Sequence, residues 1–135
     1  MNRKKVIILA AAIVLLAGLA YGVNYLINLS YYNKVMPTVT IDSVDVSKLE
    51  DGIYSGSFDA RIIAATTEVT VKDGRITKID LVKHKYERGK PAIAVVDRII
   101  SDQSLDVDVV SGATNSSKAI LKAVENALKS GPEKK

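Results

Sequence analysis

The stretch Asp108-Val109-Val110-Ser111-Gly112-Ala113-Thr114-Asn115-Ser116-Ser117 joins a turn of small residues to the start of a helix. Asn115 and Ser116 are good N-cap residues, and Gly131-Pro132 should end the helix. Its apolar stripe falls at helical spacing on Ile120, Leu121, Val124, Ala127 and Leu128. Free backbone N–H groups and the positive end of the helix dipole favour an anion at this N-terminus, above all a phosphate. We therefore expect the hydroxyl of Thr114 to be exposed beside an anion site.

Three strands are predicted upstream of this stretch, at Asp51–Phe58, Thr66–Lys72 and Arg75–Lys85. Asp73-Gly74 is a strong signal for a two-residue hairpin between the second and third strands. Gly56 shares a face of the first strand with two aromatic rings, which indicates either a bulge or the close approach of another backbone or a ligand. The third strand alternates imperfectly, so it contains a bulge or is partly covered on both faces.

A helix is predicted between the sheet and the quoted stretch. A polar loop at Glu87–Lys90 precedes Pro91, which suits the first position of a helix. The apolar stripe of this helix is Ile93, Val96, Ile99 and Ile100. A short extended segment, Leu105–Val110, then leads to the final helix. This order predicts an α+β domain at residues 49–130, in which a small antiparallel sheet is covered on one face by two helices.

The N-terminal part of the sequence is typical of a membrane anchor. After a basic start at residues 1–5, residues 6–29 contain no charge and are long enough to span a bilayer. Positive charge before this run predicts a cytoplasmic N-terminus and an extracytoplasmic domain on a single-pass protein of the cell membrane. Residues 30–48 are expected to be a tether and residues 131–135 a tail. The alternative is a signal peptide cleaved after Gly18-Leu19-Ala20.

The net charge of +4 comes from the N-terminal segment. Arg3, Lys4, Lys5 and Lys34 are the charged residues among the first 36, and the rest of the chain has equal numbers of basic and acidic residues. This balance argues against a nucleic-acid partner. The absence of Cys excludes thiolate metal sites and a Cys nucleophile, and a single His argues against a His-based metal site.

The pattern Asp-x-x-Ser-Gly-Ala-Thr, from Asp108 to Thr114, resembles the flavinylation motif of the FMN-binding domain family. That family includes the flavin subunits of Na⁺-translocating quinone reductases and Rnf-type complexes. The resemblance runs roughly from Asp51 to Lys129, and Gln103–Asp108 also resembles short, single-domain members. In the family, a separate flavin transferase attaches FMN through its phosphate to the last Thr of the motif, which corresponds to Thr114 here.

The resemblance implies a role for each residue of the motif. Gly112 and Ala113 would leave room for the flavin, and the hydroxyls of Ser111, Ser116 and Ser117 would lie near its phosphate. Asp108 would be recognised by the transferase, with a turn acceptor for backbone N–H groups as its alternative role. Outside the motif, His84 either hydrogen-bonds the flavin or its redox partner, or is simply solvated.

The implied function is electron transfer by covalently held FMN. The expected partners are the membrane, a flavin transferase, and a redox partner protein or quinone-linked donor. No acid/base or nucleophile constellation accompanies the motif, so an electron carrier is expected rather than a complete enzyme. Two alternatives remain at this point: a domain that binds FMN noncovalently, with Thr114 only capping the helix, or a flavin-free binding module of the cell envelope.

Overall fold

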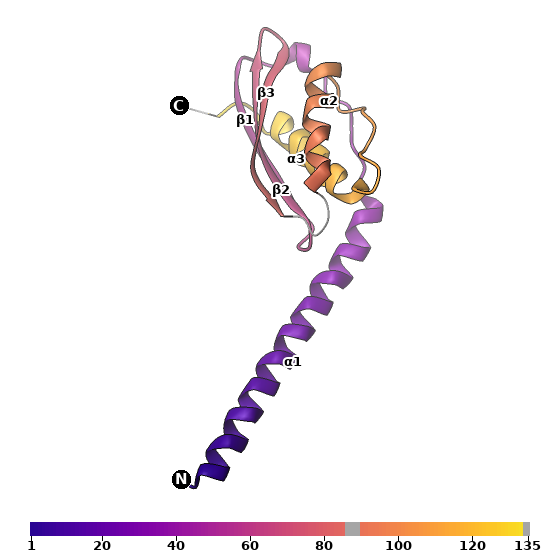
Figure 1. Ribbon diagram of the computed structural model, residues 1–135. Coiled ribbons are helices and arrows are strands. Elements are labelled where there is room, and N and C mark those ends of the chain that lie inside the picture. The colour runs from indigo at the N-terminus through magenta and orange to yellow at the C-terminus, as the bar shows by residue number, and fades with distance from the viewer. Residues whose placement is uncertain (86–89, 134–135) are drawn as a thin grey trace.

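The computed structural model describes residues 1–85 and 90–133. Its elements are the helix α1 (Arg3–Val35), the 3₁₀ turns η1 (Met36–Thr38) and η2 (Val46–Lys48), the strands β1 (Gly52–Asp59), β2 (Ala64–Lys72) and β3 (Arg75–Lys85), the turn η3 (Lys90–Ile93), and the helices α2 (Ala94–Asp102) and α3 (Thr114–Ser130). Figure 1 shows α2 and α3 on one face of the sheet and α1 extending away from the domain. The predicted fold class is therefore confirmed. The predicted polar loop at residues 87–90 lies almost wholly outside the described residues.

The sheet is antiparallel with strand order β1-β2-β3. β2 and β3 are joined at the predicted hairpin, where Asp73 and Gly74 both have positive φ, 53° and 72°. Positive φ at both central residues is what a tight type I′ hairpin requires. Strand β2 alternates strictly, and its helix-facing residues Ala65, Thr67, Val69 and Val71 are at most 1% exposed. The central strand thus forms the floor of the core.

The imperfect alternation of β3 comes from bulges. The pairing register between β2 and β3 shifts twice, so that Thr77 and Val82 lie opposite no residue of β2. An extra residue at position 77 changes the parity of the strand between Ile76 and Ile79. Both isoleucines therefore face the helices and are buried, although their spacing would place them on opposite faces of a regular strand.

Gly56 marks the close approach of a second backbone. A Cβ atom on Gly56 would lie 2.1 Å from the backbone nitrogen of Ala127 and 2.6 Å from the carbonyl oxygen of Ala123, both in α3. Of the two explanations left open by the sequence, helix contact is therefore correct for this glycine. The absence of a side chain lets α3 lie directly on β1, with small alanines on the opposing surface.

Side chains of α3 also cover the free edge of β1. Asn126 Nδ2 donates to the carbonyl oxygen of Ser57 at 2.9 Å, and Ser130 Oγ donates to that of Ser55 at 3.1 Å. The backbone N–H of Glu133 donates to the carbonyl oxygen of Ile53 at 2.7 Å. These bonds satisfy acceptors that an edge strand otherwise leaves open to pairing with another chain.

Helix α2 begins later than predicted. Pro91 lies in the 3₁₀ turn η3, and the α-helix starts at Ala94. Because a 3₁₀ turn has about three residues per turn, it turns the first residue of the predicted apolar stripe away from the core. Ile93 is 44% exposed, and Val95 is fully buried in its place. Residues 105–110 were predicted to be extended, and they form an irregular segment without strand pairing, with Leu105 buried.

Gln103 ends α2 and ties it to the sheet. Its backbone is left-handed, with φ of 52°. Its Oε1 accepts from the N–H of Ile76 at 2.7 Å, and its Nε2 donates to the carbonyl oxygens of Ile76 and Ile100 at 2.8 and 2.7 Å. The side chain thus replaces a missing strand neighbour beside the bulge at Thr77, a role that the sequence pattern did not predict.

The segment after α1 is part of the domain. α1 continues to Val35, beyond the predicted end of the anchor, and residues 36–49 then lie along the domain. Met36 and Val46 are 2% and 6% exposed, and Val46 belongs to the main core cluster. The expected tether therefore supplies core side chains, because its apolar residues cover helix and sheet surface that would otherwise face water.

Candidate flavin-attachment site

The quoted stretch forms a turn followed by the first residue of α3, which is Thr114. The N-cap position is Ala113, which has non-helical dihedral angles and makes no side-chain cap hydrogen bond. Asn115 and Ser116 were predicted as N-caps, and they lie instead inside the first turn. The first helical bond runs from Ser117 N–H to the Ala113 carbonyl oxygen at 2.9 Å. The three N–H groups before it, from residues 114 to 116, point out of the helix end and suit an anion.

Thr114 is exposed, as are its neighbours Ser111 and Gly112. Gly112 has φ of 80°, and a Cβ atom there would meet nothing within 4 Å. The glycine is therefore needed for the left-handed turn, and there is open space beside it. Ala113 is only 5% exposed and belongs to the core cluster, so its small side chain serves packing rather than clearing space for a ligand.

Ser117 holds the turn together. Its Oγ accepts from the N–H of Val110 at 3.1 Å and donates to the carbonyl oxygen of Ala113 at 2.8 Å, and the residue has no exposed surface. Ser116 is 3% exposed. Both hydroxyls were predicted to lie near the phosphate. The structure places them inside the fold, and of the three predicted serines Ser111 alone is exposed.

Asp108 presents its carboxylate to solvent. Its carbonyl oxygen accepts from Arg98 Nη1 at 2.7 Å, so α2 fixes the start of the motif. Among the described residues, the Asp108 carboxylate accepts no hydrogen bond from the turn, which removes the support for a turn-acceptor role. Asp108 and Ser111 line an open hollow of about 670 Å³ against α2, together with Asp97 and Asp102. The carboxylate is therefore accessible to a second protein.

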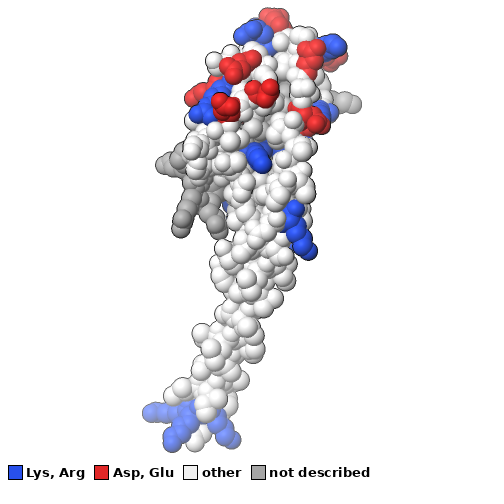
Figure 2. All heavy atoms as spheres, turned by 90° about the vertical axis from the view of Figure 1, so that its right-hand side faces the viewer, with Lys and Arg blue, Asp and Glu red and all other residues white. Residues whose placement is uncertain are grey.

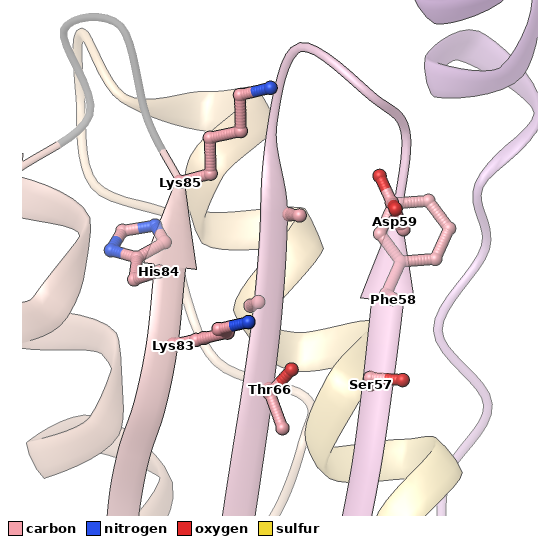
Figure 3. Close-up of a pocket in the computed structure, with 9 residues that line it drawn as sticks. Ser57, Phe58, Asp59, Thr66, Lys83, His84 and Lys85 are labelled. Carbon is pink, nitrogen blue, oxygen red and sulfur yellow. The ribbon is translucent and has the colours of Figure 1, made fainter.

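His84 lies in a different place from Thr114. It is half-buried near the end of β3, opposite Ala65 on the helix-facing side, and burial lowers the pKa of its imidazole. In Figure 3 its ring points away from β2, while Lys83 and Lys85 extend over β2. The hollow drawn there includes none of the residues 108–117 of the described chain. Among the hollows lined by described residues alone, none contains both His84 and a residue of the motif.

Asn115 connects the motif to α1, a contact that sequence reasoning missed. Its Nδ2 donates to Tyr32 Oη at 2.7 Å. The ring of Tyr32 also packs against a small apolar cluster that contains Ile62, Ile63 and Ala119. The two partners are far apart in the sequence, so no local pattern signals the contact. The last turns of α1 thus lie beside the start of α3, as Figure 1 shows.

A flavin phosphate fits this site. The described residues offer an exposed hydroxyl at Thr114, a glycine turn with open space beside it, and N–H groups at the mouth of α3. Asp108 carries the carboxylate of the motif, and its backbone is held on the α2 side of the turn. Within residues 1–85 and 90–133 no cluster of His, Asp and Glu side chains suits a metal ion. The backbone dipoles at this helix end can therefore hold a phosphate.

Fold and site together define a small α+β domain that presents a threonine hydroxyl at the mouth of its last helix. Residues 64–129, from β2 to the last turn of α3, match the model of the FMN-binding domain family. It is also similar to an uncharacterized protein of Treponema pallidum (strain Nichols), with 36% identity over 85 residues. That match covers 61% of this chain and 24% of the relative, so the chain spans about a quarter of the relative's length. No solved structure gives a significant match.

Proposed function

We propose that this protein is a single-pass membrane flavoprotein that carries FMN on Thr114 through a phosphoester bond and transfers electrons outside the cytoplasm. One observation in particular supports the covalent linkage. Thr114 is the first residue of α3, and the helix is capped at Ala113 without a side-chain bond. Among the described residues, Thr114 Oγ1 makes no hydrogen bond, so the noncovalent alternative, in which Thr114 only caps the helix, loses its support. A free, exposed hydroxyl is what a modifying enzyme requires.

Forming the bond requires a defined exchange at phosphorus. Thr114 Oγ1 attacks the flavin-side phosphorus of a flavin dinucleotide that the transferase binds and gives its proton to a base of that enzyme. The P–O–P bond of the dinucleotide breaks, and a nucleoside monophosphate leaves with the electron pair. The phosphodiester that results keeps one negative charge beside the N–H groups of residues 114–116. Asp108 is exposed on the same loop and serves as the contact that the transferase recognises. Ser117 holds that loop from inside the fold, and Arg98 holds it from the surface of α2.

The FMN supplies the redox chemistry, and the protein retains and positions it. A cofactor outside the cytoplasmic membrane is lost whenever it dissociates. A covalent bond removes that loss, so the site needs no deep pocket. The surroundings of Thr114 agree with this, because the residue lies on an exposed turn. An open site also lets the redox centre of a partner come close to the flavin.

Helix α1 supports the membrane location. The segment Arg3–Thr38 is long and apolar enough to cross a membrane, and its most apolar stretch is not buried in the fold. A surface this apolar needs cover from lipid or from another protein. We take it to be an uncleaved anchor, with the basic residues that begin the chain on the cytoplasmic side.

Denaturing electrophoresis tests the linkage. The full chain is co-expressed with a flavin transferase, and the gel is viewed under ultraviolet light. We expect a fluorescent band for the wild type and for Thr70→Val, a matched change on the open face of the sheet. The band should be lost in Thr114→Val. A band that survives Thr114→Val, or a native protein that is yellow but loses its colour on denaturation, contradicts the covalent assignment.

A further inference from the structure

The last turns of α1 are fixed against one end of the domain. Arg61, in the β1–β2 turn, donates from Nη1 to Asn28 Oδ1 at 3.5 Å, and its guanidinium lies 4.3 Å from the ring centroid of Tyr31. The bond between Asn115 and Tyr32 joins the start of α3 to the same turns. These contacts fix the position of the domain along the axis of α1.

The length of α1 places this end of the domain at the membrane surface. Residues from Val6 to Ile27 number 22 and carry no charge. At a rise of about 1.5 Å per residue they span about 33 Å, close to the roughly 30 Å of a bilayer's hydrocarbon core. If α1 spans the membrane, Asn28 lies where the hydrocarbon ends. Arg61, which contacts Asn28, then lies at the level of the lipid headgroups.

Cations gather at this end of the domain. Arg61, Lys83 and Lys85 lie in the β1–β2 turn and at the end of β3, and none has an ion pair with an acid among the described residues. We call these three residues the basic patch. Its one described acid is Asp59, whose Oδ1 accepts from the backbone N–H of Arg61 at 2.6 Å. The excess charge is therefore positive.

Acidic residues are concentrated on the rest of the domain. Figure 2 shows them on the part farthest from α1, while the part of that face next to the helix shows basic side chains only. Elsewhere in the domain, Asp42, Asp45 and Asp80 pair with lysines. The charge is thus uneven along the axis of α1. The membrane-facing end has three cations and one acid among its described residues, whereas Lys72 and Arg75 at the opposite end lie beside Asp73 and Asp51.

The basic patch also borders a hollow that can receive an anion. Lys83 and Lys85 extend over β2 on the open face of the sheet, and the hydroxyl-bearing residues Ser57 and Thr66 lie in the same hollow of about 460 Å³ (Figure 3). Asp59 lines the same hollow, so the two ammonium groups outnumber its one carboxylate. Together with the neighbouring hydroxyls they match the phosphate of a lipid headgroup in charge and in hydrogen bonding.

We propose that the basic patch contacts anionic lipid headgroups and that a headgroup phosphate binds in this hollow. The proposal depends on α1 spanning the membrane, as in the proposed function, and not on the flavin. Its consequence is that the domain is held down on the bilayer. Thr114, next to the Asn115–Tyr32 contact, then stays near the headgroup layer, within reach of an electron donor dissolved in the membrane.

Lysine acetylation tests the proposal directly. The full chain, with or without flavin, is placed in nanodiscs of phosphatidylcholine alone or with added phosphatidylglycerol, and acetylation is measured by mass spectrometry. We expect Lys83 and Lys85 to react about threefold more slowly in the anionic nanodiscs, while Lys48, Lys72 and Lys78 are unchanged. High salt should remove the difference.

Equal reaction of Lys83 and Lys85 in both nanodiscs overturns the proposal, and so does an equal slowing of all five lysines. Equal reaction is also the result expected if these cations serve an acidic protein partner instead. A chain that does not enter nanodiscs overturns the anchor and this proposal together. An inserted chain with evenly reactive lysines overturns this proposal alone and leaves the flavin assignment untouched.

A site-specific label gives a second test, because the chain has no Cys. A fluorophore on Val82→Cys, an exposed residue of β3 that does not line the hollow, should be quenched by lipids that carry a headgroup spin label. The triple change Arg61→Gln, Lys83→Gln and Lys85→Gln should at least halve this quenching, by the loss of charge attraction. The matched triple change Lys48→Gln, Lys72→Gln and Lys78→Gln should leave it unchanged. Equal quenching in both triple variants contradicts the proposal.

Discussion

At the scale of single residues, the attachment turn depends on one buried hydroxyl. Ser117 Oγ bridges the N–H of Val110 and the carbonyl oxygen of Ala113. Ser117→Ala leaves the half-buried Val110 N–H without its acceptor, so we expect the free energy of unfolding to fall by about 1–3 kcal/mol. We also expect slower flavin attachment, because the turn that presents Thr114 loses its brace.

Ser116 provides the matched control for this prediction. It is nearly as buried as Ser117, at 3% exposed, and its hydroxyl does not bridge the turn. Ser116→Ala should change stability by less than about 1 kcal/mol and leave the attachment rate unchanged. Chemical unfolding and the time course of in-gel fluorescence check both variants. Equal behaviour of the two would show that Ser117 has no special role.

A second residue-scale prediction concerns Gly56. An added Cβ would meet the backbone of Ala127, which cannot rotate away as a side chain would. Gly56→Ala should therefore lower the free energy of unfolding by about 3 kcal/mol, at the upper end for overpacking. Ser57→Ala, on the exposed side of the same strand, should cost less than about 0.5 kcal/mol. A stable Gly56→Ala protein with unchanged urea midpoint would contradict the packing described here.

At the scale of elements, a buried carboxylate fastens the segment after α1 to α3. Glu125 is 1% exposed, and its two oxygens accept from Lys122 and Lys129 at 2.8 and 2.7 Å. Lys129 also pairs with Asp42, and Lys122 donates to the carbonyl oxygen of Thr40. Burial acts to raise the pKa of Glu125, but the lysine hydrogen bonds outweigh it, and the pKa is lowered overall.

This lowered pKa predicts a pH dependence. A carboxyl group with a lower pKa in the folded state adds stability above its ordinary pKa of 4.5 and loses it as pH falls through the folded value. Unfolding between about pH 6 and pH 3 should therefore show a steeper loss of stability in the wild type than in Glu125→Gln. Glu125→Gln should cost about 1–3 kcal/mol at neutral pH. Parallel pH curves for the two proteins would contradict this account.

The sequence predicted most elements because local signals mark them. The hairpin at Asp73-Gly74 and the apolar stripe of α3 are local patterns, and both are confirmed. The start of α2 was placed too early, because Pro91 fits a 3₁₀ turn as well as an α-helix. The segment before the motif was expected to be extended because its sequence alternates. It pairs with no strand, since alternation alone does not show that a partner strand exists.

The sequence predicted the motif of the site but not the contacts that surround it. Thr114 lies exposed at the start of α3, as the capping and dipole arguments predicted. The positions of Ser117 and Asn115 depend on contacts with the turn and with α1, which a helical pattern does not encode. Serines near a helix start serve equally as ligand groups or as internal braces, so residue type alone could not separate these roles.

At the scale of the whole molecule, the domain begins before the predicted boundary at residue 49. Met36 and Val46 are buried, and burial of such side chains is worth about 1.5–3 kcal/mol each. A chain that starts at Leu49 should therefore be less stable by about 3–6 kcal/mol than one that starts at Asn28. Urea unfolding of the two shortened chains checks this. Equal midpoints would mean that residues 28–48 are a tether after all.

The central claim is that Thr114 carries a covalent flavin. The most direct measurement is the mass of the full chain after co-expression with a flavin transferase, followed by fragmentation of the peptide that contains Asp108–Ser117. We predict an added mass of one FMN less one water, located on Thr114. An unmodified chain, or an adduct located on Ser111 or any other residue, would contradict the claim.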